Sequence, residues 1–296
     1  MRLNKLAIKD KKIFNKYLTR NEHELSVFAF ENIYIWKKHF NIFWAIIGDS
    51  LCIFFKDSVG CFLYLPPLGK SNKPGVIKEA FEIMNKYNEN KELSRIENVE
   101  EKDLAFYKKI GYECVEKSCD YICKTSDMIQ LKGDKFRRKR AAYNYFVKNY
   151  KHEYLPFSLK YKNDCLKLYD AWMKNRKTTN QDAIYQGMLE DSKISLKVLL
   201  DSYKDLDLIG RIVKVGGKVK AFTFGFSLNK DMFCVIYETT DLSIKGLSQF
   251  IFREFCRESK KYKYINIMDD SGLENLKRVK LSYHPIKSAK AYIIKE

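Results

Sequence analysis

An internal repeat constrains the fold of this chain more than any other feature of its sequence. Residues 265–285 have the pattern of a strand, an acidic turn, a basic amphipathic helix and a Tyr-His-Pro stop, and residues 94–122 have a similar strand-helix-strand pattern. One offset of 171 residues (283 − 112 and 292 − 121) aligns Tyr112 with Tyr283, Tyr121 with Tyr292, Gly75 with Gly246 and Phe81 with Phe252. Because internal repetition fixes the architecture of a chain, the sequence predicts two copies of one α/β module.

The length and composition allow two folded modules. With 296 residues, the chain can bury one large core or two cores of ordinary size. A hydrophobic content of 46%, with 20 Tyr and 20 Phe, excludes general disorder. The apolar run at residues 42–47 ends at Gly48-Asp49, well short of the roughly 18 residues that span a bilayer, and the charged N-terminus lacks the apolar stretch of a secretory signal. We expect a soluble cytoplasmic protein, at most peripheral to the inner face of the membrane.

The eight cysteines suggest neither a disulfide framework nor a metal site. Most of them follow or precede aromatic and aliphatic residues, where a thiol acts as a small apolar filler. The clearest cases are Cys52, Cys61, Cys234 and Cys256. The nearest approach to ligand spacing is Cys119-x3-Cys123, and it has no second pair or nearby histidine. The sequence therefore predicts reduced core thiols and no metal.

The positive charge of the chain favours polyanionic partners. Lys and Arg number 55 against 37 acidic residues, which gives a net charge of +18. Such a balance suits nucleic acid, an anionic membrane surface or phosphorylated small molecules. The densest cluster, residues 132–140, continues into a helical pattern in which Ala142, Phe146 and Tyr150 share one face. Basic residues among aromatics fit a groove for RNA or a lipid headgroup, and a solvated helix between domains is an equally good interpretation.

The order of predicted elements is the same in both halves. Each half has a strand meander, a helix, a strand, a second helix and a last strand, which predicts a mixed, mostly antiparallel sheet flanked by helices. The clearest hairpin surrounds Gly216-Gly217, because a two-residue turn requires positive φ angles. Glu238 ends an apolar strand and Asn266 lies at the end of the next strand, so the two side chains are expected near the ends of adjacent strands.

This order of elements resembles the acyltransferase fold called GNAT, present twice in an α/β (α+β) chain. An early F-x-N-x-Y-x-W motif (Phe30, Asn32, Tyr34 and Trp36) and a late K-L-S-Y-H-P motif at residues 280–285 resemble one narrower family. It contains uncharacterised bacterial proteins related to the C-terminal catalytic domain of phosphatidylglycerol lysyltransferase. The resemblance implies a structural N-terminal copy at residues 1–130 and a catalytic C-terminal copy at residues 131–296.

The same resemblance implies transfer of an acyl or aminoacyl group to an amine or hydroxyl acceptor, such as a lipid headgroup. The donor is aminoacyl-tRNA in the lysyltransferases and acyl-CoA in ordinary GNAT enzymes, and no cofactor is bound covalently. A CoA pyrophosphate would rest on the turn before the central helix, which makes Lys245, Gly246 and Ser248 the cofactor-binding candidates. That turn keeps only the middle glycine of the GNAT pattern. Residues 266–270 also depart from the relatives' N-R-E-x-D, since the arginine and the glutamate are lost.

Three residues are candidates for the chemistry. Glu238, at the end of an apolar strand, has the setting of a general base with a raised pKa, or of a strand-end carboxylate that pairs with a lysine. Tyr283 can donate a proton to the leaving group or simply pack, and Asn266 can hold a donor carbonyl or cap the following turn. The candidate substrate-binding residues are Asp270, Arg278, Lys280, Arg137, Arg138 and Arg140.

Three functions from different classes remain open on these grounds. An aminoacyl-tRNA-dependent transferase would bind tRNA in a salt-dependent way. A CoA-dependent N-acyltransferase would be stabilised by acetyl-CoA. A non-catalytic binding protein would keep the twin fold without using Glu238. The sequence does not specify the assembly state.

Overall fold

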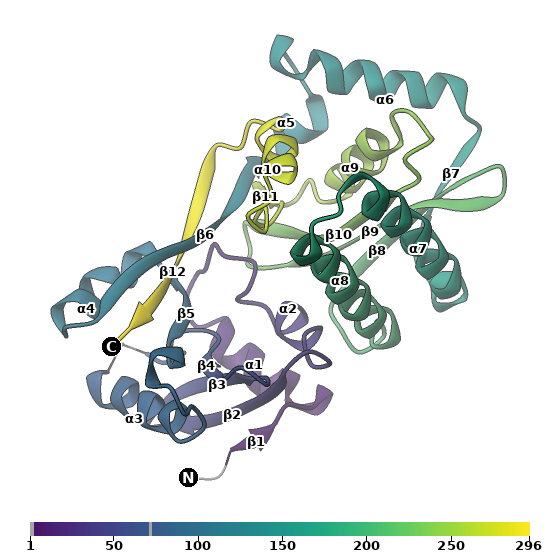
Figure 1. Ribbon diagram of the computed structural model, residues 1–296. Coiled ribbons are helices and arrows are strands. Elements are labelled where there is room, and N and C mark those ends of the chain that lie inside the picture. Colours follow the sequence, from purple (N-terminus) through teal and green to yellow (C-terminus); the bar gives the residue numbers. More distant parts are fainter. Residues whose placement is uncertain (1–2, 71–72) are drawn as a thin grey trace. The chain divides into compact units, whose positions relative to one another are not determined.

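The computed structural model describes residues 3–70 and 73–296, which separate into two compact units (Figure 1). Unit 1 contains the described residues up to Asp120 together with Asp269–Lys277 and Ser288–Glu296. Unit 2 contains Tyr121–Met268 and Arg278–Lys287. These units differ from the predicted ranges 1–130 and 131–296, because the last strand of the chain packs with the first half.

Unit 1 is a sheet with helices on both faces. Its strands are β1 (Asn4–Lys5), β2 (Asn41–Ile47), β3 (Ser50–Lys56), β4 (Cys61–Leu63), β5 (Ile96–Glu100), most of β6 (Glu113–Lys124) and β12 (Lys287–Lys295). Its helices are α1 (Lys11–Leu18), α2 (Phe30–Tyr34), α3 (Pro74–Asn85), α4 (Leu104–Lys109) and the start of α10 (Glu274–Leu281). The β4–β5 pair is parallel, and β1–β2, β2–β3, β3–β4 and β5–β12 are antiparallel.

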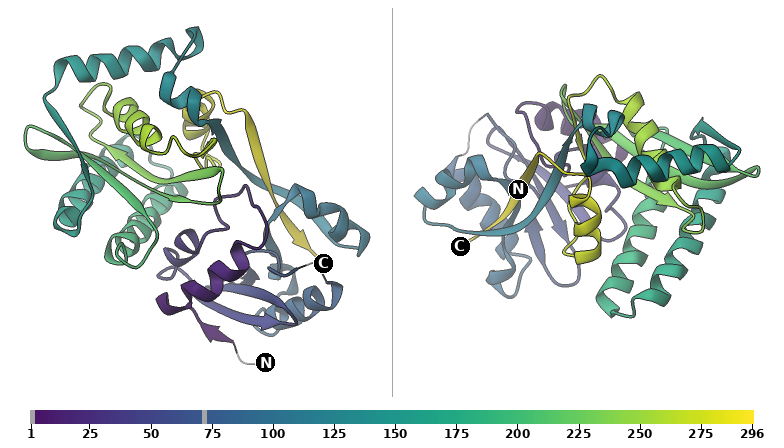
Figure 2. Two further views of the ribbon diagram at one scale, coloured as in Figure 1. Left: turned by 180° about the vertical axis from the view of Figure 1, so that it is seen from behind. Right: turned by 90° about the horizontal axis from the view of Figure 1, so that it is seen from above.

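Alternation along β2 divides the core of unit 1 between the two faces of its sheet. Trp44 packs edge-on against Phe14 of α1, and its neighbour Ala45 faces the cluster that α3 covers. Figure 2 shows α1 and α3 on opposite faces of this sheet. Phe30, the first residue of the early motif, is fully buried in the short helix α2 and packs on Phe14. That motif therefore belongs to the core of unit 1.

Unit 2 has the same layered construction. Its strands are the end of β6, β7 (His152–Pro156), β8 (Ile209–Val215), β9 (Lys218–Ser227), β10 (Met232–Thr240) and β11 (Tyr264–Asn266). Its helices are α5 (Thr125–Gln130), α6 (Arg137–Asn149), α7 (Lys162–Thr179), α8 (Ala183–Asp201), α9 (Leu247–Glu258) and the end of α10. The strand order is β6-β11-β10-β9-β8-β7, with only β10 and β11 parallel among these pairs.

The two faces of the unit 2 sheet carry different helices. Ala221 of β9 faces Leu247 and Phe250 of α9, whereas Phe224 faces Phe157 and Tyr203 on the other side. Helices α7 and α8 lie on that second face, and α6 lies across α9 (Figure 1). The predicted hairpin is confirmed, since Gly216 and Gly217 have φ angles of 58° and 76° between β8 and β9.

The repeat predicted at an offset of 171 residues corresponds to equivalent contacts in the two units. Phe81 of α3 packs on Tyr112, with ring centroids 5.1 Å apart. The aligned residues of the second half, Phe252 of α9 and Tyr283, also pack together at 4.7 Å. Two copies of one module are therefore confirmed at the level of side-chain packing.

Each unit is completed by a strand from the other half of the sequence. β12, the last strand of the second copy, pairs with β5, with Ala291 opposite Glu100. The end of β6, the last strand of the first copy, pairs with β11, with Lys124 opposite Tyr264. This exchange explains why the compact units differ from the predicted domain ranges.

Membrane-spanning helices, metal sites and disulfides are not expected from the sequence, and the described residues bear on each. No helix within residues 3–70 and 73–296 is long and apolar enough to cross a membrane. The same ranges contain no group of three His, Cys, Asp or Glu side chains suited to a metal ion. The cysteines are thiols rather than disulfides, and burial raises the pKa of Cys61 to about 12, which keeps that thiol unreactive.

A candidate active site in unit 2

A bulge in β10 decides which face of the sheet receives Glu238. Val235 pairs with Gly225 of β9 and Tyr237 pairs with the next residue, Phe224, so Ile236 is an extra residue in β10. Without this bulge, alternation would point Val235 and Tyr237 to the same face. The hydroxyl of Tyr237 instead reaches the carbonyl of Ser192 on α8 at 3.0 Å. Glu238 therefore points to the opposite face, which α9 covers.

One oxygen of the Glu238 carboxyl group is shielded from solvent, although the residue as a whole is half-buried. Its Oε2 atom is buried and has no hydrogen-bond partner. Within residues 3–70 and 73–296 the other buried carboxylate oxygen without a hydrogen bond is Oδ1 of Asp170, and it pairs with Lys193. Burial raises the pKa of Glu238 to about 8, against the opposing effect of the positive charge of Lys139. The predicted raised pKa has a physical cause here, because no donor stabilises the charged form.

The charge of Lys139, on α6, favours ionisation of this carboxyl group and so lowers its pKa. The Nζ atom of Lys139 donates a hydrogen bond to Ser282 Oγ at 2.9 Å and lies 3.3 Å from the centre of the Tyr283 ring. Burial lowers the pKa of Lys139 to about 8, although the charge of Glu238 opposes the shift. The carboxyl and the ammonium are therefore a coupled pair that titrates near the same pH.

Lys139 is not among the site residues predicted from the sequence, although its neighbours Arg137, Arg138 and Arg140 are. The signal was present in the spacing, because Lys139, Tyr143 and Phe146 follow the i, i+4, i+7 pattern of one helical face. Tyr143 and Phe146 both pack on Phe250 of α9, at 5.7 and 4.8 Å between ring centroids. This face of α6 therefore carries Lys139 toward the sheet.

Tyr283 lies at the buried end of the late motif. Its ring packs against Phe252, and only 9% of the residue is exposed. Burial and the charge of Glu238 hold the pKa of Tyr283 well above its ordinary value, so the phenol keeps its proton. The structure thus brings two predicted catalytic residues, Glu238 and Tyr283, within one electrostatic environment.

Asn266, the third predicted catalytic residue, has a conformational role in this structure. It is fully buried at the end of β11, and its Oδ1 accepts the backbone N–H of Met268 at 2.7 Å. This bond stabilises a turn in which Met268 has a φ of 61°. β11 lies beside β10, with Asn266 opposite Cys234, so the predicted adjacency of the two strands is confirmed.

The turn proposed for a CoA pyrophosphate is covered by α6. Gly246 has a φ of 85°, and a Cβ atom added there would lie 2.1 Å from the carbonyl oxygen of Ala142. Lys245 lies over the Tyr145 ring at 4.7 Å. Asp241 stabilises the start of the turn, since its Oδ1 accepts both the N–H and the hydroxyl of Ser243, at 3.0 and 2.6 Å, while its Oδ2 pairs with Lys220 at 2.7 Å. Of the three predicted cofactor-binding residues, Gly246 and Lys245 thus lie against α6, and Ser248 lies half-buried in the first turn of α9.

The predicted substrate-binding residues fall into two groups. Three of them bind backbone groups of nearby loops. Arg140 donates to the carbonyls of Leu131 and Gly133, and Lys280 donates to the carbonyl of Ile267. Asp270 accepts the N–H of Gly272. Arg137, Arg138 and Arg278 are exposed. The structure places Arg137 and Arg138 at the start of α6 and Arg278 on α10.

The first half lacks an equivalent of the Glu238 carboxyl group. At the repeat offset (238 − 171 = 67) it has Pro67. The buried carboxylates of unit 1 are paired, as Glu97 accepts Lys117 at 2.6 Å and Glu100 contacts His23 at 2.8 Å. These contacts agree with a structural first copy, which remains a prediction.

The repeated module, whose strands within the described residues form one mostly antiparallel sheet of 12 strands flanked by helices, defines a tandem GNAT-like acyltransferase fold. The chain is similar to a tandem GNAT protein from the clavulanic acid biosynthesis pathway, with a TM-score of 0.52 and 7% identity over 99% of this chain and 97% of that one. It belongs to the family described as phosphatidylglycerol lysyltransferase, C-terminal, which it matches over residues 19–295. The family and the fold predicted from sequence are therefore confirmed.

Solved structures that are similar over nearly the whole chain include proteins of two bacteria. A conserved protein of unknown function from Bacteroides thetaiotaomicron VPI-5482 is 28% identical, with a TM-score of 0.89 and coverage of 99% of both chains. L-PGS from Bacillus licheniformis is 17% identical, with a TM-score of 0.68 over 99% of this chain and 93% of that one. No curated protein matches the sequence.

Proposed function

We propose that this protein is an aminoacyl-tRNA-dependent transferase that moves an aminoacyl group to an amine or hydroxyl acceptor, such as a lipid headgroup at the inner face of the membrane. The observation that carries the proposal is the buried, unpartnered Oε2 of Glu238, with a pKa near 8, beside Lys139 and Tyr283. An unsatisfied buried carboxyl group costs stability, so its presence favours a catalytic role. The family description, which names a lysyltransferase, supports the reaction class.

The reaction needs a group that accepts the proton of the acceptor and groups that stabilise the negative charge that develops on the carbonyl oxygen. The acceptor oxygen or nitrogen attacks the carbonyl carbon of the aminoacyl ester, and its proton passes to Glu238. The bond between that carbon and the ribose oxygen then breaks, and the ribose oxygen takes the proton from Glu238. Lys139 supplies positive charge beside the reacting groups, and the Tyr283 phenol, which keeps its proton, is a hydrogen-bond donor.

The covered turn argues for tRNA rather than CoA as the source of the acyl group. A diphosphate on residues 243–248 would meet the Ala142 carbonyl. The carbonyl oxygen of Ala142 closes on Gly246 and turns the negative end of its dipole toward it, which disfavours a pyrophosphate at that glycine.

The direct test offers both donors to the purified protein. Total tRNA charged with radiolabelled amino acids, or radiolabelled acetyl-CoA, is incubated with the protein and lipids of the host, and organic and aqueous phases are separated. We expect label to pass from tRNA to the acceptor and none from acetyl-CoA. Transfer from acetyl-CoA alone, or thermal stabilisation by micromolar acetyl-CoA, would contradict the proposal.

Replacement of Lys139 by methionine should change the pH dependence of transfer. Without the nearby positive charge, ionisation of Glu238 becomes harder, so its pKa rises further. We expect the half-maximal rate to move to higher pH by about one unit. The control is Lys148→Met, which removes an exposed charge of the same helix. Equal pH profiles for the two variants would show that Lys139 has no electrostatic effect on Glu238.

A further inference from the structure

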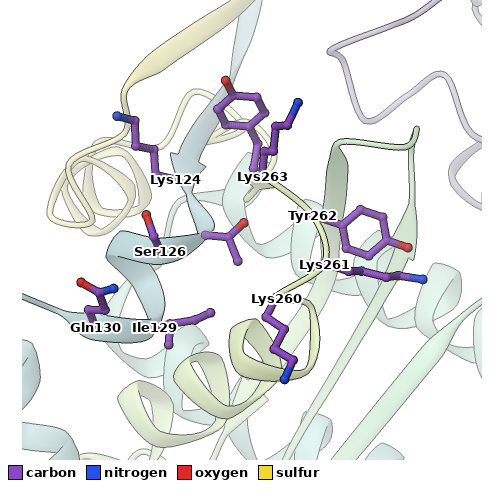
Figure 3. Close-up of a pocket in the computed structure, with 10 residues that line it drawn as sticks. Lys124, Ser126, Ile129, Gln130, Lys260, Lys261, Tyr262 and Lys263 are labelled. Atoms are coloured by element: carbon purple, nitrogen blue, oxygen red, sulfur yellow. The ribbon is translucent and has the colours of Figure 1, made fainter.

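A cavity lined by lysines lies at the end of β11 opposite to Asn266. Its volume is about 470 Å³, within the range of roughly 300–1,000 Å³ that holds small ligands. It is lined by Lys124, Thr125, Ser126, Ile129, Gln130, Lys260, Lys261, Tyr262, Lys263 and Tyr264, all of them in unit 2. Figure 3 shows the lysine side chains leaving its rim in different directions, with Ser126 and Gln130 on the α5 side. Glu238, Asn266 and Tyr283 do not line this cavity.

The fold brings these residues together from separate segments. Lys124 ends β6 and lies opposite Tyr264 of β11 in the antiparallel pair. The backbone N–H of Thr125 donates to the carbonyl of Lys263 at 3.0 Å, which joins the start of α5 to the loop before β11. The loop itself carries the sequence Lys-Lys-Tyr-Lys at residues 260–263. The backbone segments that carry these lysines are therefore held together by the fold and not only by sequence proximity.

The cavity has an excess of positive charge. Lys263 pairs with Asp231 at 3.2 Å. Neither Lys124 nor Lys260 has a carboxylate partner among the described residues, and Lys261 lies over the Tyr262 ring at 4.9 Å. Three of the four lysines thus have no neutralising anion, which favours an anionic ligand.

A buried hydroxyl on the cavity wall points to the same ligand. Thr125 is only 3% exposed, and its Oγ1 has no hydrogen-bond partner. Buried hydroxyls are ordinarily satisfied, because leaving one unpaired costs stability. An oxygen of a bound anion would provide the missing partner, since a hydroxyl can donate to it.

We propose that this cavity binds a backbone phosphate of RNA, which under the proposed function is the donor tRNA. The lining favours RNA over a lipid surface, because none of its residues is among the exposed large hydrophobic side chains that insertion into a membrane uses. The hydroxyls of Thr125 and Ser126 and the amide of Gln130 supply hydrogen bonds, and the lysines supply charge.

The cavity is remote from the proposed chemistry. Met232 of β10 lies opposite Tyr264, and Glu238 follows six positions later along the same strand, a separation of roughly 20 Å at the rise of an extended chain. A phosphate bound here lies several nucleotides from the reacting ester. The site therefore contributes to RNA affinity and not to the chemical step.

The test measures binding of a fluorescently labelled, uncharged tRNA transcript over a range of salt concentrations. The cavity variant combines Lys124→Gln, Lys260→Gln and Lys261→Gln. The control combines Lys197→Gln, Lys204→Gln and Lys218→Gln, which are exposed lysines of the same unit. Both variants lower the net charge from +18 to +15 (18 − 3), so a difference between them reports on position rather than on total charge.

We expect the cavity variant to lose at least tenfold in affinity at 150 mM salt, and the control to lose less than threefold. The slope of log Kobs against log salt should become shallower by about 0.7 in the cavity variant, since one phosphate contact contributes about 0.7 with single strands. Thr125→Val should weaken binding about threefold without lowering the melting temperature, because it removes only an unpaired hydroxyl.

Equal losses in the two triple variants, or no RNA binding by the wild type, would overturn the proposal. So would a cavity variant that loses binding to phosphatidylglycerol vesicles and retains the tRNA. The assay needs neither aminoacylation nor turnover. A protein that binds RNA through this cavity but transfers nothing would therefore refute the proposed function alone.

Discussion

Replacing Glu238 by glutamine should stop transfer and stabilise the fold in the same variant. A general base contributes about 10²–10⁴-fold to a rate, and glutamine cannot accept the proton, so we expect transfer from charged tRNA to fall by at least 100-fold. The shape of the side chain is kept. The control is Glu153→Gln, which removes an exposed carboxyl group of unit 2.

The gain in stability should depend on pH in a defined direction. The pKa of Glu238 is about 8 in the folded protein and 4.5 in its ordinary state, so between these values only the folded chain holds the proton. Raising the pH through this window therefore lowers the free energy of unfolding of the wild type. The glutamine variant escapes this loss, and we expect it to be more stable at pH 8 by on the order of 2 kcal/mol.

Urea unfolding at pH 5 and at pH 8 measures this effect. At pH 5 the wild type and the variant should differ little, because Glu238 is protonated in the folded state of the wild type. A variant that is less stable than the wild type at pH 8 would show that the carboxyl group serves the fold, and would favour the non-catalytic binding protein.

The second large effect is expected at Gly246. Alanine there would adopt a left-handed φ of 85° and place its Cβ 2.1 Å from the backbone oxygen of Ala142. Because a backbone atom cannot move aside cheaply, α6 must shift away from α9. We expect Gly246→Ala to lower the free energy of unfolding by about 3 kcal/mol or more, and to impair transfer because α6 carries Lys139.

The internal repeat provides the matched control for this substitution. Gly75 is aligned with Gly246, but it lies within α3 with nothing within 4 Å of an added Cβ. Gly75→Ala should be neutral or stabilising by about 0.5 kcal/mol, because alanine favours a helix. Chemical denaturation followed by circular dichroism measures both variants. Equal effects at the two glycines would contradict the packing of α6 against the Gly246 turn.

The sequence predicts the repeated elements well, because they follow from local patterns. Alternation and the Gly216-Gly217 pair predict the β8–β9 hairpin, and the offset of 171 residues aligns Phe81 with Phe252 and Tyr112 with Tyr283, which form equivalent contacts in the structure. The exchange of β6 and β12 has no local signal, since the period of a strand does not specify its partner. The predicted domain boundary therefore differed from the compact units.

The sequence indicates the setting of Glu238 in the candidate site, and much less of what surrounds it. The end of an apolar strand indicates a dry carboxyl group, but the extra residue Ile236 that aims it toward α9 is visible only in the register of β10 and β9. The basic cluster of α6 was evident from the sequence. Which of its cations faces inward depends on helix packing. In the structure Lys139 lies over the Tyr283 ring, whereas Arg140 donates hydrogen bonds to loop carbonyls.

The central claim is that the ionised carboxylate of Glu238 removes a proton from the acceptor during transfer from aminoacyl-tRNA. The most direct test is the initial rate of transfer from precharged, radiolabelled tRNA between pH 5.5 and 9, corrected for hydrolysis of the ester without protein. We predict a rate that rises about tenfold per pH unit and levels off above pH 8 in the wild type, with no such rise in Glu238→Gln. A pH-independent rate, or the same rising profile in the glutamine variant, would contradict the claim.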